Sequence, residues 1–133
     1  MSNPPFCAQV NAFVEEADRQ ERWKADHDEA MACLHVESLV AFGIATYEVV
    51  DVVDRKIRLL IAQGKSPVRP AFWGKVDKAF ESLAVATKIA LRIAQKCERR
   101  GYAVDRIDRL REIVARLKSV AASRKNIDLA ATE

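Results

Sequence analysis

The sequence has little glycine or proline, with four of each in 133 residues. Turns depend on these two residue types, so loops must be few and short. Their scarcity excludes a β fold of many short strands and favours long helices. Half of the residues are hydrophobic and 31% are charged, which is typical of a globular domain and not of a disordered chain. We therefore predict a single helical domain over residues 1–133.

Cysteine is also scarce. The chain has three cysteines, Cys7, Cys33 and Cys97, which is an odd number, and no two of them have CxxC spacing. We therefore expect no disulfide framework. Each cysteine is expected to act as a small apolar side chain in a reducing compartment.

No apolar run is long enough for a membrane span. The longest, from Leu39 to Val53, is interrupted by Thr46, Glu48 and Asp51 and falls short of the roughly 20 residues that a span requires. The N-terminus has no positive segment followed by an apolar core, so we see no signal peptide. We expect a cytoplasmic protein without a membrane partner.

Catalytic and metal-binding signatures are missing too. His27 and His35 are eight residues apart, and neither has a glutamate three residues before it, so zinc and di-iron patterns are absent. Glu48 and Asp51 lie one helical turn apart, but Arg55 lies one turn beyond Asp51 and favours a surface ion pair over acid–base catalysis. No glycine-rich phosphate loop exists. We predict a non-enzymatic protein with no cofactor and no bound metal.

Helical periodicity indicates four segments, at about 6–23, 27–63, 71–100 and from 105 onward. Asp26 followed by Glu29 forms a capping-box pattern that favours a break there, although the pattern leaves open whether the first two helices are continuous. Gly64 to Pro70 is the clearest turn. We predict an all-α, four-helix up-down bundle with two long central helices and two shorter flanking ones. Residues 1–5 and 125–133 are predicted to be disordered tails.

The segment 27–63 is apolar around most of its circumference. Its polar residues form one narrow stripe, which consists of Glu37, Glu48, Asp51, Arg55 and Arg58. A helix of this kind lies at the centre of a bundle or faces a second subunit. Three neighbouring helices cannot cover so wide an apolar surface. We therefore predict a self-associating adaptor or accessory subunit that forms a homo-oligomer.

The charges are unevenly distributed along the chain. Residues 1–64 carry 11 acidic and 6 basic side chains, whereas residues 65–133 carry 8 acidic and 16 basic ones. The basic residues of the two C-terminal helices form a predicted ridge, which consists of Lys88, Arg92, Lys96, Arg99, Arg106, Arg109 and Arg116. Such a ridge can follow a phosphate backbone. The alternative function is therefore binding of nucleic acid or of an acidic protein partner, and the competing interpretation is a solvated face with internal ion pairs.

In helix order and length, this layout is similar to that of small bundle proteins of the ribosomal intervening-sequence and retroelement accessory type. The resemblance concerns the layout of the whole chain and carries over no individual residue. It implies ring-like oligomers that associate with nucleic acid or with a reverse transcriptase.

Overall fold

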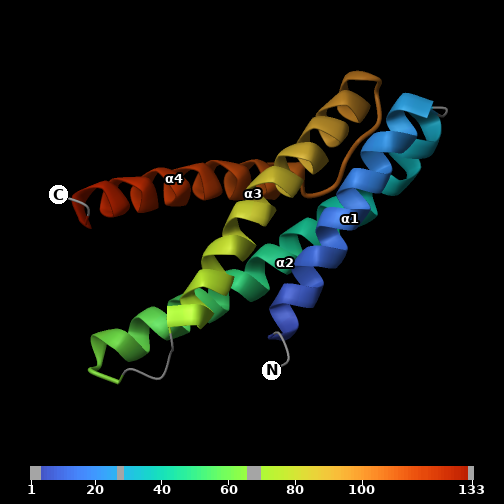
Figure 1. The fold of residues 1–133 in the computed structure, drawn as a ribbon. Coiled ribbons are helices and arrows are strands. Elements are labelled where there is room, and N and C mark those ends of the chain that lie inside the picture. Colours follow the sequence, from blue (N-terminus) through green and yellow to red (C-terminus); the bar gives the residue numbers. More distant parts are fainter. Residues whose placement is uncertain (1–3, 27–28, 66–69, 132–133) are drawn as a thin grey trace.

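The chain folds into four packed α-helices, as a computed structural model shows (Figure 1). The structure describes residues 4–26, 29–65 and 70–131, with side chains for 4–23, 32–65 and 72–121. The helices are α1 (Pro5–Asp26), α2 (Glu29–Ala62), α3 (Pro70–Arg99) and α4 (Ile107–Ala131). No strand occurs in these ranges. The predicted fold class, with two long helices and two shorter ones, is confirmed.

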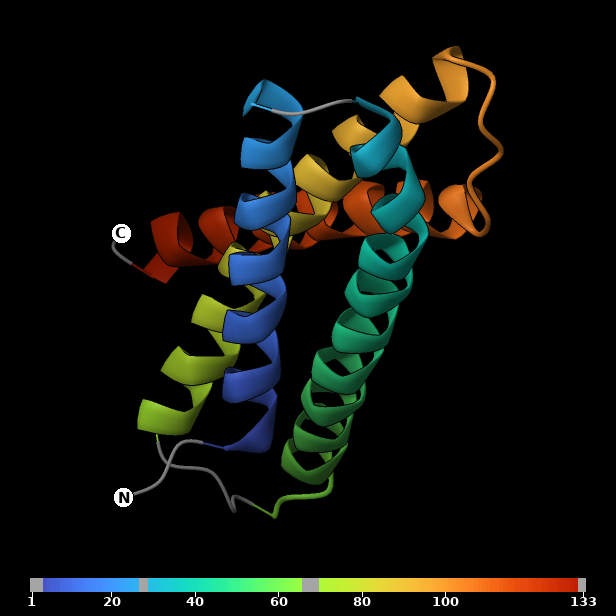
Figure 2. The same ribbon diagram turned by 90° about the vertical axis from the view of Figure 1, so that its right-hand side faces the viewer.

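The first three helices alternate in direction, and α4 crosses them. In Figures 1 and 2, α1, α2 and α3 run up, down and up, whereas α4 lies across them and extends beyond the other three at its C-terminal end. α4 packs on α2 and α3, and within the described part of the chain it has no such packing against α1. The core is therefore built around α2 and α3, because each of them contacts the three other helices. In the described part of the chain, α1 and α4 do not contact each other.

Two glycines end the long helices, as the sequence predicted. Gly64 and Gly101 have positive φ angles of 73° and 94°. In each case the next residue donates its N–H to a carbonyl five residues earlier, Lys65 to Leu60 at 2.9 Å and Tyr102 to Cys97 at 3.1 Å. This pattern is the Schellman motif, in which the left-handed residue costs glycine no steric strain.

The ends of α1, α2 and α4 differ in part from expectation. The break between α1 and α2 falls where the capping box predicted it, although residues 27–28 themselves lie outside the described ranges. α4 begins at Ile107 and not at Asp105, whose N–H points instead to Glu37 Oε1 at 3.3 Å. Arg106, with φ 62°, turns the chain into the helix. α4 continues to Ala131 and so includes residues 125–131 of the segment expected to be a disordered tail.

The core is apolar, with a few polar groups that bond locally. The largest fully buried apolar side chains come from all four helices and are Tyr47, Phe13, Leu39, Ile44, Leu83, Ile93, Leu110 and Ile113. Buried Thr87 donates its hydroxyl to the Leu83 carbonyl at 2.6 Å, the back-bond expected from its place in the helix. Gly43 lies under the Phe13 ring, where an added Cβ would be 2.8 Å from Phe13 Cζ. The absence of a side chain at this position therefore sets the separation of α1 and α2.

Cys33 and Cys97 form a disulfide, so the expectation of three unpaired cysteines was wrong. The bond joins the first turns of α2 to the last turn of α3, with a Cα–Cα distance of 5.6 Å. Antiparallel helices bring the start of one beside the end of the other, and the two cysteines are equidistant in sequence from Lys65, in the turn. Cys7 is the free cysteine and is half-buried.

We predict that the disulfide contributes substantially to stability. Replacing both Cys33 and Cys97 with serine should lower the free energy of unfolding by roughly 2–4 kcal/mol, because the bond closes a loop with a sequence separation of 64 in the unfolded chain. Denaturant titration of the two forms measures the loss. Cys7→Ser is the matched control and should change stability by less than about 1 kcal/mol. Equal stability of the oxidised and reduced wild-type chain would contradict the prediction.

Candidate functional site

The largest unpartnered apolar feature of the described chain is the solvent-facing side of α2. Five of the seven large hydrophobic side chains that are exposed belong to this helix, and these are Leu34, Val49, Val52, Leu59 and Ile61. Leu34 is 74% exposed, Val52 63% and Leu59 57%. Side chains of this type are normally buried on folding, and a line of them along one helix marks a contact surface.

The three most exposed of these residues, Leu34, Val52 and Leu59, belong to a regular line that we call the outward stripe. It follows alternating steps of four and three residues along α2 and consists of Leu34, Ser38, Ala41, Ala45, Glu48, Val52, Arg55 and Leu59. All eight are exposed. The stripe extends over roughly 38 Å at 1.5 Å per residue. Steps of four and three are the spacing with which one helix contacts another in a coiled coil.

The stripe is exposed because the other helices occupy the remaining sides of α2. α1 and α3 cover the apolar side that includes Leu39, Val50 and Ile57. α4 covers the side that carries Asp51, part of the polar stripe that the sequence analysis expected to face solvent. The other four members of that polar stripe, Glu37, Glu48, Arg55 and Arg58, remain exposed, so the solvent-facing side of α2 carries charges as well as apolar side chains.

Polar contacts hold α4 against α2. Asp51 accepts an ion pair from Arg55 at 2.9 Å, as predicted, and a second one from Arg116 of α4 at 3.6 Å. The guanidinium of Arg109 lies 6.0 Å from the centre of the buried Tyr47 ring. Burial, with the nearby Asp51 carboxylate, raises the pKa of Tyr47 above its usual value near 10, against a smaller opposite effect of Arg116.

The structure divides the predicted basic ridge into two groups. Lys88, Arg92, Lys96 and Arg99 lie on the outer side of α3, where Lys96 is half-buried and the other three are exposed. Arg109 and Arg116 point toward α2 instead, and Arg106 is in the turn before α4. The division follows from the crossing of α4, because a helix lying along α3 would have placed both sets side by side.

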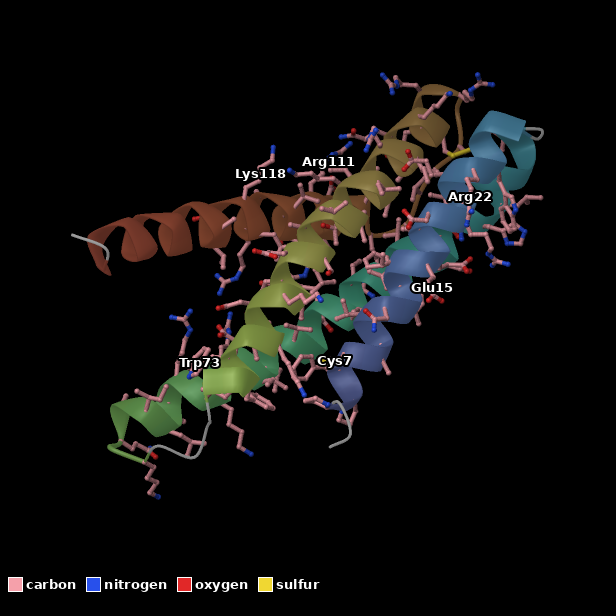
Figure 3. All side chains as sticks on the ribbon, viewed as in Figure 1. Cys7, Glu15, Arg22, Trp73, Arg111 and Lys118 are labelled. Carbon is pink, nitrogen blue, oxygen red and sulfur yellow. A yellow bond between two sulfur atoms is a disulfide. The ribbon has the colours of Figure 1, made fainter. Side chains whose placement is uncertain are left out.

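Several basic residues of α4 are in ion pairs. Arg109 binds Glu112 at 3.2 Å, and Arg111 binds both Asp108 at 2.8 Å and Glu98 of α3 at 3.1 Å. Arg111 lies at the crossing of α3 and α4 in Figure 3. It was not among the predicted ridge residues. Its position depends on the angle between the two helices, which residue spacing does not determine.

No described group of three or more His, Cys, Asp or Glu side chains could hold a metal ion. His35 packs its ring against Trp23 at 5.2 Å, and His27 lies outside the described residues. A cavity of about 260 Å³ between α1 and α3 is lined by Cys7, Val10, Asn11, Lys75, Lys78, Ala79 and Ser82. Neither histidine nor carboxylate is among these lining residues.

No described helix is long and apolar enough to cross a membrane. No protein-family model, characterised protein or solved structure matches the chain.

The raised pKa of Tyr47 predicts a loss of stability at high pH. The unfolded tyrosine releases its proton near pH 10, whereas the folded one keeps it to higher pH, so the folded state binds more protons in that window. Stability should be unaffected by this group below pH 10 and should fall as pH rises above it. Tyr47→Phe should flatten this part of the decline, which denaturant titrations at several pH values can measure. An equally steep decline in the variant would contradict the prediction.

Proposed function

We propose that the protein is a non-enzymatic, self-associating interaction protein, in which the outward stripe of α2 is the contact surface. One observation carries the proposal: Leu34, Val52 and Leu59 are more than half exposed along a single line at coiled-coil spacing. Burying a side chain of this size stabilises an interface by roughly 1.5–3 kcal/mol. Three such residues from each copy supply enough free energy to offset part of the cost of association.

The proposal gains support from the rest of the surface. Outside α2, the large hydrophobic side chains exposed in the described ranges are Val85 on α3 and Tyr102 in the turn after it. Each is isolated, as single apolar residues commonly are on soluble proteins. The outward stripe differs because its members repeat in register along one helix.

A matched pair of substitutions tests the proposal. Val52→Glu places a charge in the outward stripe, whereas Val85→Glu makes the same change on α3, and the two valines are 63% and 62% exposed. We expect Val52→Glu to weaken self-association by roughly a hundredfold, because the charge would be buried unpaired. Val85→Glu should have no such effect.

Light scattering and sedimentation over a range of concentrations measure the association. Circular dichroism of both variants checks that they remain helical. A wild-type chain that stays monomeric at tens of micromolar, about the range in which a weak specific dimer forms, would overturn the proposal. Equal weakening by both substitutions would exclude the outward stripe as the contact.

A second candidate function is binding of nucleic acid by the outer side of α3. Lys88, Arg92 and Arg99 are exposed there and have no ion-pair partner among the described residues. They lie at steps of four and seven residues, so their charges share one side of the helix. Unpaired cations in a line can contact successive phosphates, and each contact releases a counterion. Arg109 and Arg116 are not part of this surface, because they face α2.

For this second candidate, binding to a duplex or single-stranded oligonucleotide should weaken steeply as salt increases. The double variant Lys88→Glu with Arg92→Glu should reduce affinity at low salt by at least about tenfold, because two phosphate contacts are lost. Each lost contact should also lower the slope of log affinity against log salt concentration by about one. The double variant Lys56→Glu with Lys65→Glu, at two exposed positions toward the other end of the bundle, is the control of equal charge change and should bind nearly as wild type. Fluorescence anisotropy gives both quantities, and binding that is independent of salt would exclude this function.

The disulfide argues against the predicted cytoplasmic location. Disulfides persist in oxidising compartments and are rare in the cytosol. The bond between Cys33 and Cys97 therefore favours a location outside the cytosol. Alkylation of free thiols in intact cells, followed by mass analysis of the chain, distinguishes the two locations.

A further inference from the structure

We propose that two copies of this chain pair through their outward stripes in antiparallel orientation, with Ala41 of one copy beside Val52 of the other. The inference rests on the proposed self-association and adds the partner's orientation and register. It concerns only the exposed side of α2 and requires no rearrangement of the four helices.

The order of residues in the outward stripe is the first argument. Leu34 and Leu59 lie equally far in sequence from the point between Thr46 and Tyr47. The same is true of Ala41 and Val52. A two-fold axis at that point therefore places each leucine against a leucine of the second copy, and Ala41 against Val52. In antiparallel coiled coils, opposing positions pair in this way, with each member of one heptad series facing a member of the other.

The charged members of the outward stripe are the second argument. Glu48 and Arg55 occupy the same heptad series as Leu34 and Ala41. A parallel pair would place Glu48 against Glu48 and Arg55 against Arg55, and like charges in contact disfavour a pairing. The antiparallel pair places Glu48 level with Ala45 of the second copy, and Arg55 level with Ser38. The two Arg55 positions are then about 25 Å apart along the axis, whereas the two Glu48 positions lie in adjacent layers about 4.5 Å apart along it. Arg55 is therefore the residue whose repulsion disfavours the parallel pair.

The edge of the outward stripe is the third argument. Glu37 and Arg55 are both exposed, and they lie five helical turns apart on the same side of α2. In an antiparallel pair, the same side of each helix meets its counterpart, so Glu37 of one copy lies beside Arg55 of the other. Arg55 also binds Asp51 of its own chain at 2.9 Å, which holds its guanidinium at this edge.

The size of the central side chains agrees with this arrangement. Ala41 and Ala45 present only methyl groups, which leave room for the larger Val52 and Glu48 side chains of the second copy opposite them. The leucines lie at the two ends, where they close the contact against solvent.

Disulfide trapping between single-cysteine variants tests the orientation. Ala41→Cys and Val52→Cys are made separately in a Cys7→Ala chain, which keeps the Cys33–Cys97 bond and has no other free thiol. Each variant is oxidised alone and as an equal mixture, after time for subunit exchange. We expect a covalent dimer in the mixture, at least about tenfold more abundant than in either variant alone. In the antiparallel register two Ala41 positions are about 16 Å apart along the axis, too far for a disulfide.

The controls separate the possible failures. Val85→Cys, on the exposed side of α3, measures random collision when oxidised with Ala41→Cys. Covalent dimers that form as readily within each variant alone would establish a parallel pair and overturn the inference, while self-association would stand. A chain that dimerises by light scattering but gives no covalent dimer above the Val85→Cys control would place the contact elsewhere and likewise overturn it. A chain that remains monomeric would refute the proposed function itself.

Discussion

The antiparallel pairing of α2 with α3 is the constraint on which the rest of the structure depends. Its turn is set by Gly64, and its far end is fixed by the Cys33–Cys97 disulfide. A pair of helices fastened at both ends cannot slide by a turn without breaking one fastening. α1 and α4 then pack against a surface whose register is already determined.

The way α1 and α4 use that surface decides what is left exposed. α1 approaches closely where Gly43 makes room for the Phe13 ring. α4 crosses on the opposite side, where Asp51 binds Arg116 and Tyr47 lies under Arg109. These contacts cover the apolar side and one polar side of α2. The side that faces solvent is therefore the outward stripe, with Leu34, Val52 and Leu59.

Local sequence signals predicted much of this fold. Apolar periodicity gave the four helices, and Gly64 and Gly101 gave the ends of α2 and α3, because left-handed backbone is a property of the residue itself. The Thr87 back-bond and the Asp51–Arg55 pair were also predictable, since both partners lie within one turn of the same helix.

Features that depend on the relation between helices were harder to predict. The crossing of α4 depends on the Arg106 turn and on side-chain packing against two helices, and no residue spacing encodes it. The predicted ridge was consequently divided, and Arg111 was missed. The disulfide is different, because a signal existed: Cys33 and Cys97 are symmetric about the predicted turn, and antiparallel pairing would place them side by side. The number of cysteines alone does not indicate this bond, which becomes predictable only when the antiparallel pairing of the two helices is taken into account.

The arrangement of the outward stripe says more about its role than its hydrophobicity does. Any helical protein exposes some apolar side chains, as Val85 and Tyr102 illustrate here. What separates the stripe from them is its regular spacing and the position of Arg55, where a parallel partner would place two guanidinium groups in contact and an antiparallel one would separate them. Charges in such a line weaken indiscriminate association and leave one orientation favoured. A solvated surface has no need of that order, whereas the proposed antiparallel pairing of two copies depends on it.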